Sequence, residues 1–182
     1  MPAPAKTSDE AIVRAARALV ERDGAAALSM QAVAEAVGVR APSLYKRFPD
    51  RETLLDTVVL EGLDELRARL DEAGAGKRPR LALGGMARAY RAFARRSPGL
   101  YALMFAPRAE GEALLARRAA ALEPVMTALA ELVDGDDQLP AARMLTAFLH
   151  GFVSMEIAGA FRMGGDVQRA FVYSLDRLLG SL

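Results

Sequence analysis

Alanine and leucine, two of the strongest helix formers, dominate this sequence: it contains 37 Ala and 25 Leu among its 182 residues. Cysteine and tryptophan are absent, and the single histidine is His150. A disulfide scaffold, a thiolate zinc site, a cysteine nucleophile and a zinc site built from several histidines are therefore excluded. We predict an all-α fold of about nine helices, with no metal site and no cofactor.

The formal net charge is only +1, from 24 basic and 23 acidic residues. Because the chain as a whole has no strong field, any contact with nucleic acid must come from a local patch. The longest stretch without Asp, Glu, Lys or Arg runs from Met144 to Met155, which is shorter than the roughly 20 apolar residues of a membrane span. The opening residues MPAPAK have no apolar signal core. We expect a cytoplasmic protein with no membrane partner.

Apolar residues recur at helical spacing along most of the chain. Thr7 and Glu10 form a candidate capping box for the first helix, and Ser29 and Asp50 are candidate N-caps further on. The Gly-rich, basic stretch Ala73 to Pro79 is the clearest linker. The predicted helices span residues 7–23, 29–38, 42–48, 50–72, 80–96, 98–106, 110–133, 140–163 and 166–182.

The segment from Ser29 to Phe48 has the outline of a helix-turn-helix: a short helix, a turn at Gly38 and a second short helix. In the second helix, Leu44 and Phe48 are spaced to pack inward, and Ser43, Lys46 and Arg47 share another face. A cationic face of this size fits the major groove of DNA. The alternative is that the apolar residues are simply core and the basic residues a solvated face.

The local charge favours a DNA contact, because every acid between Val39 and Asp56 follows Pro49, which leaves the groove-facing part purely cationic. Arg51 is unfavourable for the dipole at the start of a helix, and a phosphate bound there would explain it. Ser29 and the free amides opening its helix are a second candidate phosphate site.

The string GVRAPSLYKRFPDRETLL, from Gly38 to Leu55, closely resembles the signature of the TetR family of bacterial transcriptional regulators, and the likeness extends over roughly the first sixty residues. Arg51 stands where the family usually has Lys, and it keeps the charge. The resemblance implies double-stranded DNA as a partner. The residues at positions that the family uses for DNA contact are Ser29, Gln31, Arg40, Ala41, Pro42, Ser43, Tyr45, Lys46, Arg47 and Arg51.

The resemblance also implies two domains, a helix-turn-helix DNA-binding domain over residues 1–50 and a helical-bundle ligand-binding and dimerisation domain over residues 51–182. Three later strings are similar to the subset of the family with a His-Gly-containing C-terminal domain, although the Trp often found there is absent. These strings are YRAFARRSPGLYALMF, FLHGFVSMEIAG and DVQRAFVYSLDRLL.

The last two predicted helices are candidates for a dimer interface, since one is apolar nearly all round and the other is strongly amphipathic. The alternative is that they fill the core of one protomer. The candidate interface residues are Phe152, Val153, Glu156, Phe171, Leu175 and Leu178.

Aromatic and methionine side chains in the C-terminal part are candidates for lining a pocket for a small, largely apolar effector, although such residues more often belong to the core. The lone His150 is expected to be hydrogen-bonded in a core or interface. The candidate pocket residues are Tyr90, Phe93, Tyr101, Met104, Phe105, Met126, Met144 and Phe148.

These observations favour a homodimeric repressor that binds a palindromic operator and is released when a ligand shifts the helix starting at Asp50. The main alternative is a small helical ligand-binding protein or enzyme with an incidental helix-turn-helix, but no catalytic constellation supports an enzyme. A DNA-compacting protein is disfavoured by the net charge of +1.

Overall fold

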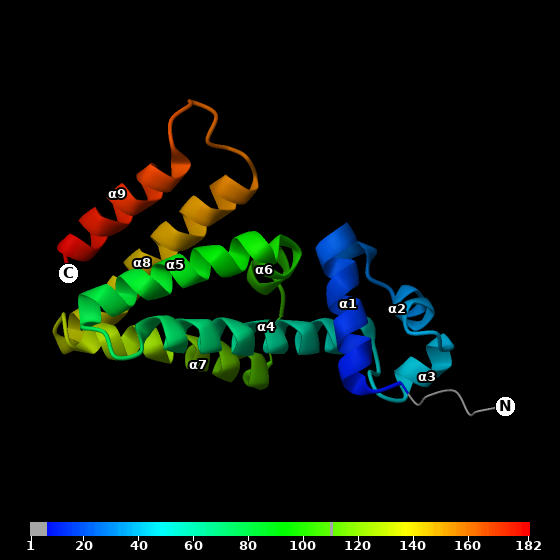
Figure 1. The fold of residues 1–182 in the computed structure, drawn as a ribbon. Helices are drawn as coiled ribbons and strands as arrows, with labels where there is room; N and C mark the ends of the chain where they lie inside the picture. Colours follow the sequence, from blue (N-terminus) through cyan, green and yellow to red (C-terminus); the bar gives the residue numbers. More distant parts are fainter. Residues whose placement is uncertain (1–6, 110) are drawn as a thin grey trace. The chain divides into compact units, whose positions relative to one another are not determined.

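The computed structural model describes residues 7–109 and 111–182, and over these residues it contains nine α-helices, one short 3₁₀-helix and no strand (Figure 1). The predicted all-α class is confirmed. The helices are α1 (Asp9–Asp23), the 3₁₀-helix η1 (Ala25–Ala27), α2 (Met30–Ala36), α3 (Ala41–Tyr45), α4 (Arg51–Gly74), α5 (Pro79–Arg96), α6 (Pro98–Phe105), α7 (Glu112–Ala130), α8 (Gly135–Ile157) and α9 (Val167–Gly180).

Several helix ends differ from the sequence prediction because of local hydrogen bonds. The N-cap of α1 is Ser8 and not Thr7: the Ser8 hydroxyl accepts a hydrogen bond from the N–H of Ala11 at 3.2 Å. Helix α3 ends at Tyr45, after which the N–H groups of Arg47 and Phe48 both donate to the carbonyl of Leu44 at 2.9 Å in a turn. The predicted cap Asp50 is confirmed, since its Oδ1 accepts from the N–H of Thr53 at 2.7 Å.

Helix α8 is displaced toward the N-terminus from its predicted range of 140–163. It begins at Gly135, so that Pro140 lies inside the helix instead of opening it. It ends at Ile157 because Gly159 takes a positive φ of 61° and the N–H of Ala160 returns to the carbonyl of Met155 at 2.8 Å. Residue 110, the predicted start of the helix observed as α7, lies outside the described residues.

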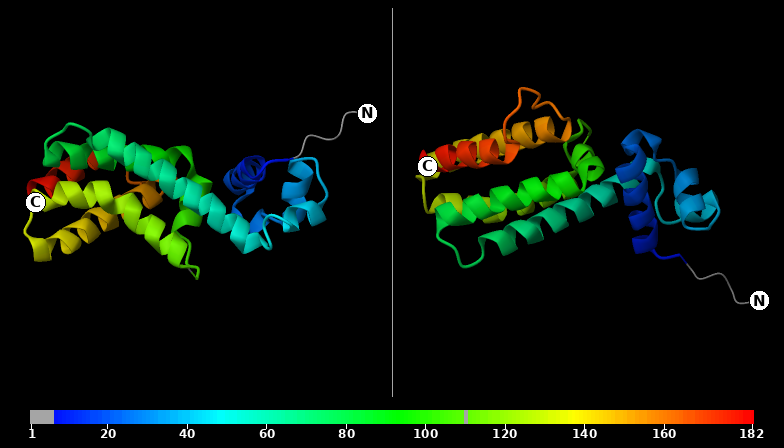
Figure 2. Two further views of the ribbon diagram at one scale, coloured as in Figure 1. Left: turned by 90° about the horizontal axis from the view of Figure 1, so that it is seen from below. Right: turned by 45° about the horizontal axis from the view of Figure 1, so that its top comes forward.

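By its internal contacts the chain forms two compact units, each shown within Figure 2. The first unit comprises the chain up to Leu63 together with Ser97–Leu114, and the second comprises Asp64–Arg96 together with Leu115–Leu182. The functional division at residue 50 stays a prediction. The observed units divide inside α4 and assign α6 to the first unit, because α6 packs against α1.

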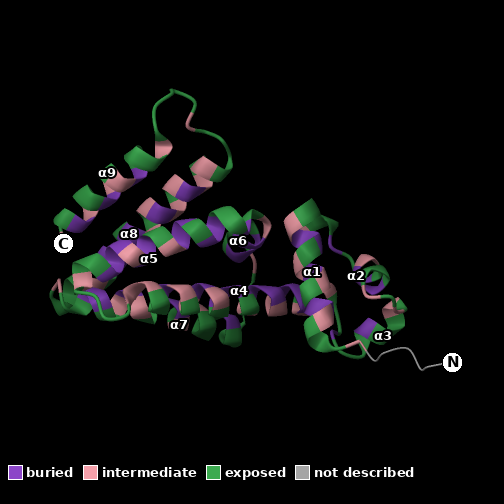
Figure 3. Ribbon diagram, viewed as in Figure 1, coloured by how far each residue is buried: buried purple, intermediate pink, exposed green. Residues whose placement is uncertain are grey.

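The core of the first unit is formed by the inward faces of its helices, coloured purple in Figure 3. Leu54, Val58 and Val59 on α4 are fully buried, as are Ala16 and Val20 on α1. Burial of such apolar side chains is the main favourable term for folding. The apolar residues that recur at helical spacing in this part of the sequence therefore form the buried face of α4.

In the second unit, α5 packs against both α8 and α9. Phe171 on α9 is fully buried and its ring contacts the rings of Phe148 and Phe152 on α8, with centroids 6.0 and 5.2 Å apart. Val153 and Leu175 are fully buried as well. The prediction that Val153, Phe171 and Leu175 face a partner is wrong, because their side chains are buried in the core of the protomer itself.

None of the helices in the described part of the chain is long and apolar enough to cross a membrane.

Candidate nucleic-acid interface

Helices α2 and α3 pack against each other around a turn at Gly38. Ser29 caps α2 by accepting the N–H of Ala32 at 3.1 Å, and Gly38 has a φ of 71°, which only glycine adopts without strain. The N–H of Val39 then returns to the carbonyl of Ala34 at 2.9 Å. These bonds hold the start of α3 at a defined place after α2, which is the requirement of a helix-turn-helix.

The side chains of α3 and of the three residues after it separate into an inner and an outer face, as predicted. Leu44 is 1% exposed and Phe48 is 6% exposed, so both anchor α3 in the core of the first unit. Tyr45 is 51% exposed, and Ser43 and Lys46 are exposed beside it. A large aromatic residue left this open on a short helix is available for a partner, because it contributes little to the core.

The cationic surface around α3 is interrupted by an acid from α1. Arg47 forms an ion pair with Asp9, a residue 38 positions earlier in the chain. Hydrogen bonds from Ser8 and from a backbone N–H lower the pKa of the neighbouring Glu10, and the nearby charge of Arg47 makes a smaller contribution in the same direction. The expectation of a purely cationic face is therefore wrong, because it counted only charges that are close in sequence.

Arg40 and Lys46 differ from Arg47 in this respect. Both are exposed, and no described residue forms an ion pair with either of them. Arg40 precedes α3 as its N-cap residue, and Lys46 follows α3. They are the two cations of this surface that the described part of the chain leaves uncompensated.

Arg51 makes contacts that the sequence did not reveal. Its Nε donates to the carbonyl of Leu28 at 2.8 Å and its Nη2 donates to the carbonyl of Ala25 at 2.5 Å, while Nη1 pairs with Glu52. The guanidinium thus ties the start of α4 to η1 and the residue after it. This role explains an arginine in the first turn of α4 without a bound phosphate.

The remaining predicted contact residues lie on the surface of the same element pair. Gln31 is exposed and donates to Glu35 at 2.7 Å. Ala41 is half-buried and Pro42 is exposed in the first turn of α3. The predicted phosphate site at the start of α2 is weakened, because the amide of Ala32 is already bonded to Ser29. DNA contact by the ten predicted residues stays a prediction.

The eight predicted pocket residues are divided between the two units. Tyr101, Met104 and Phe105 lie on α6 in the first unit, and the other five lie in the second. Phe93 and Met104 are fully buried, whereas Phe105 and Met144 are 37% and 40% exposed. The effector pocket stays a prediction. Among the described residues, no group of three His, Asp or Glu side chains is placed to hold a metal ion.

Two family models match the chain. The model described as "Bacterial regulatory proteins, tetR family" matches residues 12–58, which include α2 and α3. The model described as "Tetracyclin repressor-like, C-terminal domain" matches residues 83–178. The match to the first model ends near the start of α4, and the second covers more than half of the chain.

A curated relative and two solved structures are similar over most of their length. An uncharacterized HTH-type transcriptional regulator of Mycobacterium tuberculosis is 35% identical over 160 residues, which cover 86% of this chain and 73% of that protein. A structure of a protein of unknown function from Rhodococcus sp. RHA1 is 26% identical with a TM-score of 0.85, covering 100% and 98% of the two chains. A TetR variant from Acinetobacter baumannii in complex with minocycline is 22% identical with a TM-score of 0.74, covering 97% and 96%.

Proposed function

The chain belongs to the TetR family of bacterial transcriptional regulators and is a DNA-binding regulator, and on this basis we propose that it is a homodimeric repressor. The proposed dimer binds a palindromic operator and is released from it by a small, largely apolar ligand. Family membership removes the alternative of an incidental helix-turn-helix. Regulators of this family are generally not enzymes, and we infer that this chain performs no catalysis. The assignment to the His-Gly subset stays a prediction.

The observation that carries the proposal is the outer face of α3. The buried side chains of Leu44 and Phe48 anchor this segment in the core of the first unit. Tyr45 and Lys46 are exposed on its outer side, and Arg40 is exposed at the N-cap of α3. Lysine and arginine pair with phosphates, and a tyrosine hydroxyl donates to a phosphate while its ring rests on sugar or a thymine methyl. One short helix makes few contacts, so two copies related by a two-fold axis are needed for useful affinity.

A gel-shift assay with the DNA upstream of the chain's own gene tests this function. We expect a sequence-specific shift at moderate salt for the native chain, and none for the double variant Tyr45→Ala with Lys46→Ala. Arg80→Ala is the matched control, because Arg80 is exposed on α5 in the other unit. A native chain that shifts unrelated DNA equally well, or a double variant that still binds, contradicts the proposal.

The proposed dimer interface follows from the outward faces of α8 and α9. On α8, Met144 and Met155 are 40% and 47% exposed, with the exposed small residues Ala147 and Gly151 between them. Apart from its chain neighbours and the backbone of its own helix, no described atom lies within 4 Å of the place where a side chain at Gly151 would begin. Glycine inside a helix costs about 0.5 to 1 kcal/mol relative to alanine, so the close approach of a second helix is a better reason for it than the protomer's own packing.

On α9 the exposed residues include Tyr173, which is 62% exposed and lies under the guanidinium of Arg177 at 5.3 Å. This outward face, and not the buried Phe171 and Leu175, is the surface we assign to the partner protomer. Of the interface residues predicted from sequence, Phe152, Glu156 and Leu178 are half-buried.

The dimer is tested by placing a charge on this face. Ala147→Arg is expected to give monomers in sedimentation analysis, because an arginine there blocks close helix packing. Ala119→Arg is a matched control, since Ala119 is an exposed alanine inside α7. A dimer that survives Ala147→Arg, or one lost equally in both variants, contradicts the assigned interface.

The ligand response is supported by the way α6 is joined to α1 in the first unit. The carboxylate of Glu21 accepts the N–H groups of Gly99 and Leu100 at 2.9 and 3.0 Å, so a residue of α1 caps α6. A side chain at position 99 would begin 2.5 Å from the carbonyl oxygen of Val20, so only glycine allows this approach. A ligand that displaces α6 therefore displaces α1, and it acts only through its different affinity for the two positions.

Helix α4 is the second connection. It runs without a break from Arg51, beside the helix-turn-helix, to Gly74 in the second unit. Arg108, after α6, pairs with Asp56 on α4 inside the first unit. The TetR variant from A. baumannii was solved in complex with minocycline, and this supports the proposal of a small-molecule effector for the present chain. We infer that a ligand acts on α4 and α6 together.

A further inference from the structure

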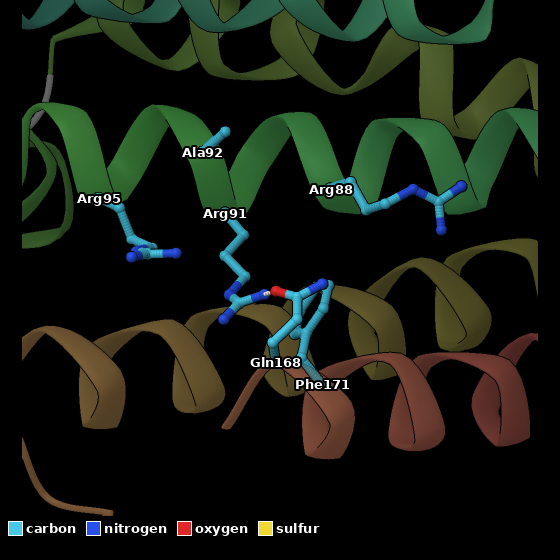
Figure 4. A pocket seen from close by; sticks show the side chains of 6 residues that line it. All are labelled: Arg88, Arg91, Ala92, Arg95, Gln168 and Phe171. Carbon is cyan, nitrogen blue, oxygen red and sulfur yellow. Dashed lines mark hydrogen bonds between the residues drawn. The ribbon is translucent and has the colours of Figure 1, made fainter. Parts of the chain in front are cut away.

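The arginines of this chain differ in how far the protein already uses their donors. Arg91 is one extreme: its guanidinium donates to the side-chain oxygen of Gln168 (Figure 4) and to both carboxylate oxygens of Glu156, at 2.7 Å each. In the helix-turn-helix, Arg51 is similarly occupied, because it donates to two backbone carbonyls and pairs with an acid. Arginines held in this way have no vacant pair of donors for a ligand.

Arg40 is the other extreme. Its side chain is exposed and makes no capping hydrogen bond, and no ion pair joins it to any residue in the ranges 7–109 and 111–182. Arg47, on the other side of α3, is paired with Asp9. Of the three arginines between Ser29 and Arg51, all of them described, Arg40 is the one whose charge and planar fork of donors have no partner.

The place of Arg40 in the fold determines what this fork can reach. Arg40 immediately precedes α3, and the positive φ of Gly38 with the bond from Val39 to Ala34 fixes where α3 begins. In a helix-turn-helix the first residues of the second helix contact base edges in the major groove. Lys46 lies after the opposite end of α3, and its ammonium group is a point charge suited to a phosphate.

We propose that Arg40 recognises one guanine in each half-site of the operator, an inference that rests on the proposed function. The arginine fork donates to both O6 and N7 of guanine, which is the commonest specific contact in the major groove. Next to Arg40, Ala41 is half-buried and Pro42 is exposed, and small apolar side chains contact the methyl group of thymine. The five residues of α3 include no Asn, Gln, Asp or Glu, the side chains that select adenine or cytosine. The preferred half-site therefore contains a guanine beside thymine.

Selection from a library of random palindromic DNA by the full-length chain, followed by sequencing of the bound DNA, tests the proposal. We expect the native chain to retain a guanine at one position of each half-site. Arg40→Ala is expected to lose the preference at that position, because alanine has no donor for O6 or N7. Lys46→Ala is the matched control: its binding is expected to be weaker, with the same base preference as the native chain.

A change in the DNA tests the same contact without a variant of the protein. Replacing the selected guanine of one half-site with 7-deazaguanine removes the N7 acceptor and preserves the base pair. The affinity of the native chain, measured by fluorescence anisotropy, is expected to fall about tenfold or more, which is the usual contribution of a hydrogen bond to a charged group. Arg40→Ala is expected to bind both forms of the operator equally.

Three results overturn the assignment of Arg40. The first is a guanine preference that persists in Arg40→Ala. The second is an Arg40→Ala variant that binds all sequences more weakly and keeps the native preference, which indicates a phosphate contact. The third is a native chain that binds the 7-deazaguanine operator as tightly as the unmodified one. A native chain that enriches no sequence contradicts the proposed operator itself, so a failure of the proposed function is distinguishable from a failure of this assignment.

Discussion

Two cationic regions of this chain use the same side chains in opposite ways. Around α3, Arg40 and Lys46 are exposed and no described residue pairs with them, whereas on α5 the guanidinium of Arg91 is buried and bound by Glu156 and Gln168. In the first region the charge is presented outward, and in the second it joins three helices. The partner of a cation, and not its position in a basic string, therefore decides whether it is a binding residue or a structural one.

Breaking the buried pair gives the largest expected effect. In Glu156→Ala, Arg91 stays 6% exposed without its counterion, so the free energy of unfolding is expected to fall by about 3 to 5 kcal/mol. Urea denaturation followed by circular dichroism measures this loss.

The control for that experiment is an exposed pair. Arg22 and Asp23 lie 2.6 Å apart at the surface, where solvent screens their attraction, so Arg22→Ala is expected to leave stability unchanged. Equal losses in Glu156→Ala and Arg22→Ala would remove the distinction between the two kinds of cation.

Removing an outward cation is expected to affect binding instead of stability. In Lys46→Ala, each half-site loses about 1.4 kcal/mol, so operator affinity of the dimer falls about a hundredfold, and the slope of affinity against salt concentration falls by about 1 per half-site. Fluorescence anisotropy with labelled operator at several salt concentrations measures both. Unchanged urea denaturation confirms that the fold is intact, and an unchanged salt slope in a variant with an intact fold contradicts the assignment of Lys46 as a phosphate contact.

The sequence was sufficient to predict the structural features that depend on residues close together along the chain. Helical spacing predicted the all-α class, the cap at Asp50 and the inward packing of Leu44 and Phe48, because each is set by contacts within a few residues. The family signature likewise lies in one continuous string.

Contacts between residues that are distant along the chain could not be predicted from the sequence. Asp9 neutralises Arg47 across 38 positions, and Arg51 donates to carbonyls 23 and 26 positions away, so counting nearby charges misjudged both arginines. Apolar periodicity also could not distinguish a core face from an interface face. Phe171 and Leu175 therefore seemed suitable for a partner although the protomer buries them completely.

Glu21 is intermediate between the buried pair and the exposed cations, because its carboxylate accepts backbone N–H groups and does not pair with a cation. Glu21→Ala leaves the N–H groups of Gly99 and Leu100 without their acceptor, and the expected loss is about 1 kcal/mol, the usual contribution of a helix cap. Thermal denaturation measures it. Glu21→Gln keeps one acceptor oxygen and is expected to lose less, so a glutamine variant as unstable as the alanine variant would show that charge and not capping matters there.

The smallest effect concerns the pH dependence of the buried pair. The hydrogen bonds from Arg91, with the charges of Arg91 and Arg95, lower the pKa of Glu156 below its ordinary value of 4.5. A carboxyl group whose pKa is lower in the folded state stabilises the fold above its unfolded pKa, and this contribution is lost as the pH falls through the folded pKa.

The native chain and Glu156→Gln, which cannot titrate at that position, are compared by urea denaturation from about pH 3 to about pH 7. We expect the native chain to be more stable by a constant amount near neutral pH, because Glu156 is fully ionised there in both states. Below pH 4.5 the difference is expected to shrink as the carboxylate takes up a proton and the attraction to Arg91 disappears. A difference that stays constant or grows on acidification would mean that the charge of Glu156 contributes nothing to holding Arg91, and the contrast between the inward and the outward cations would then rest on burial alone.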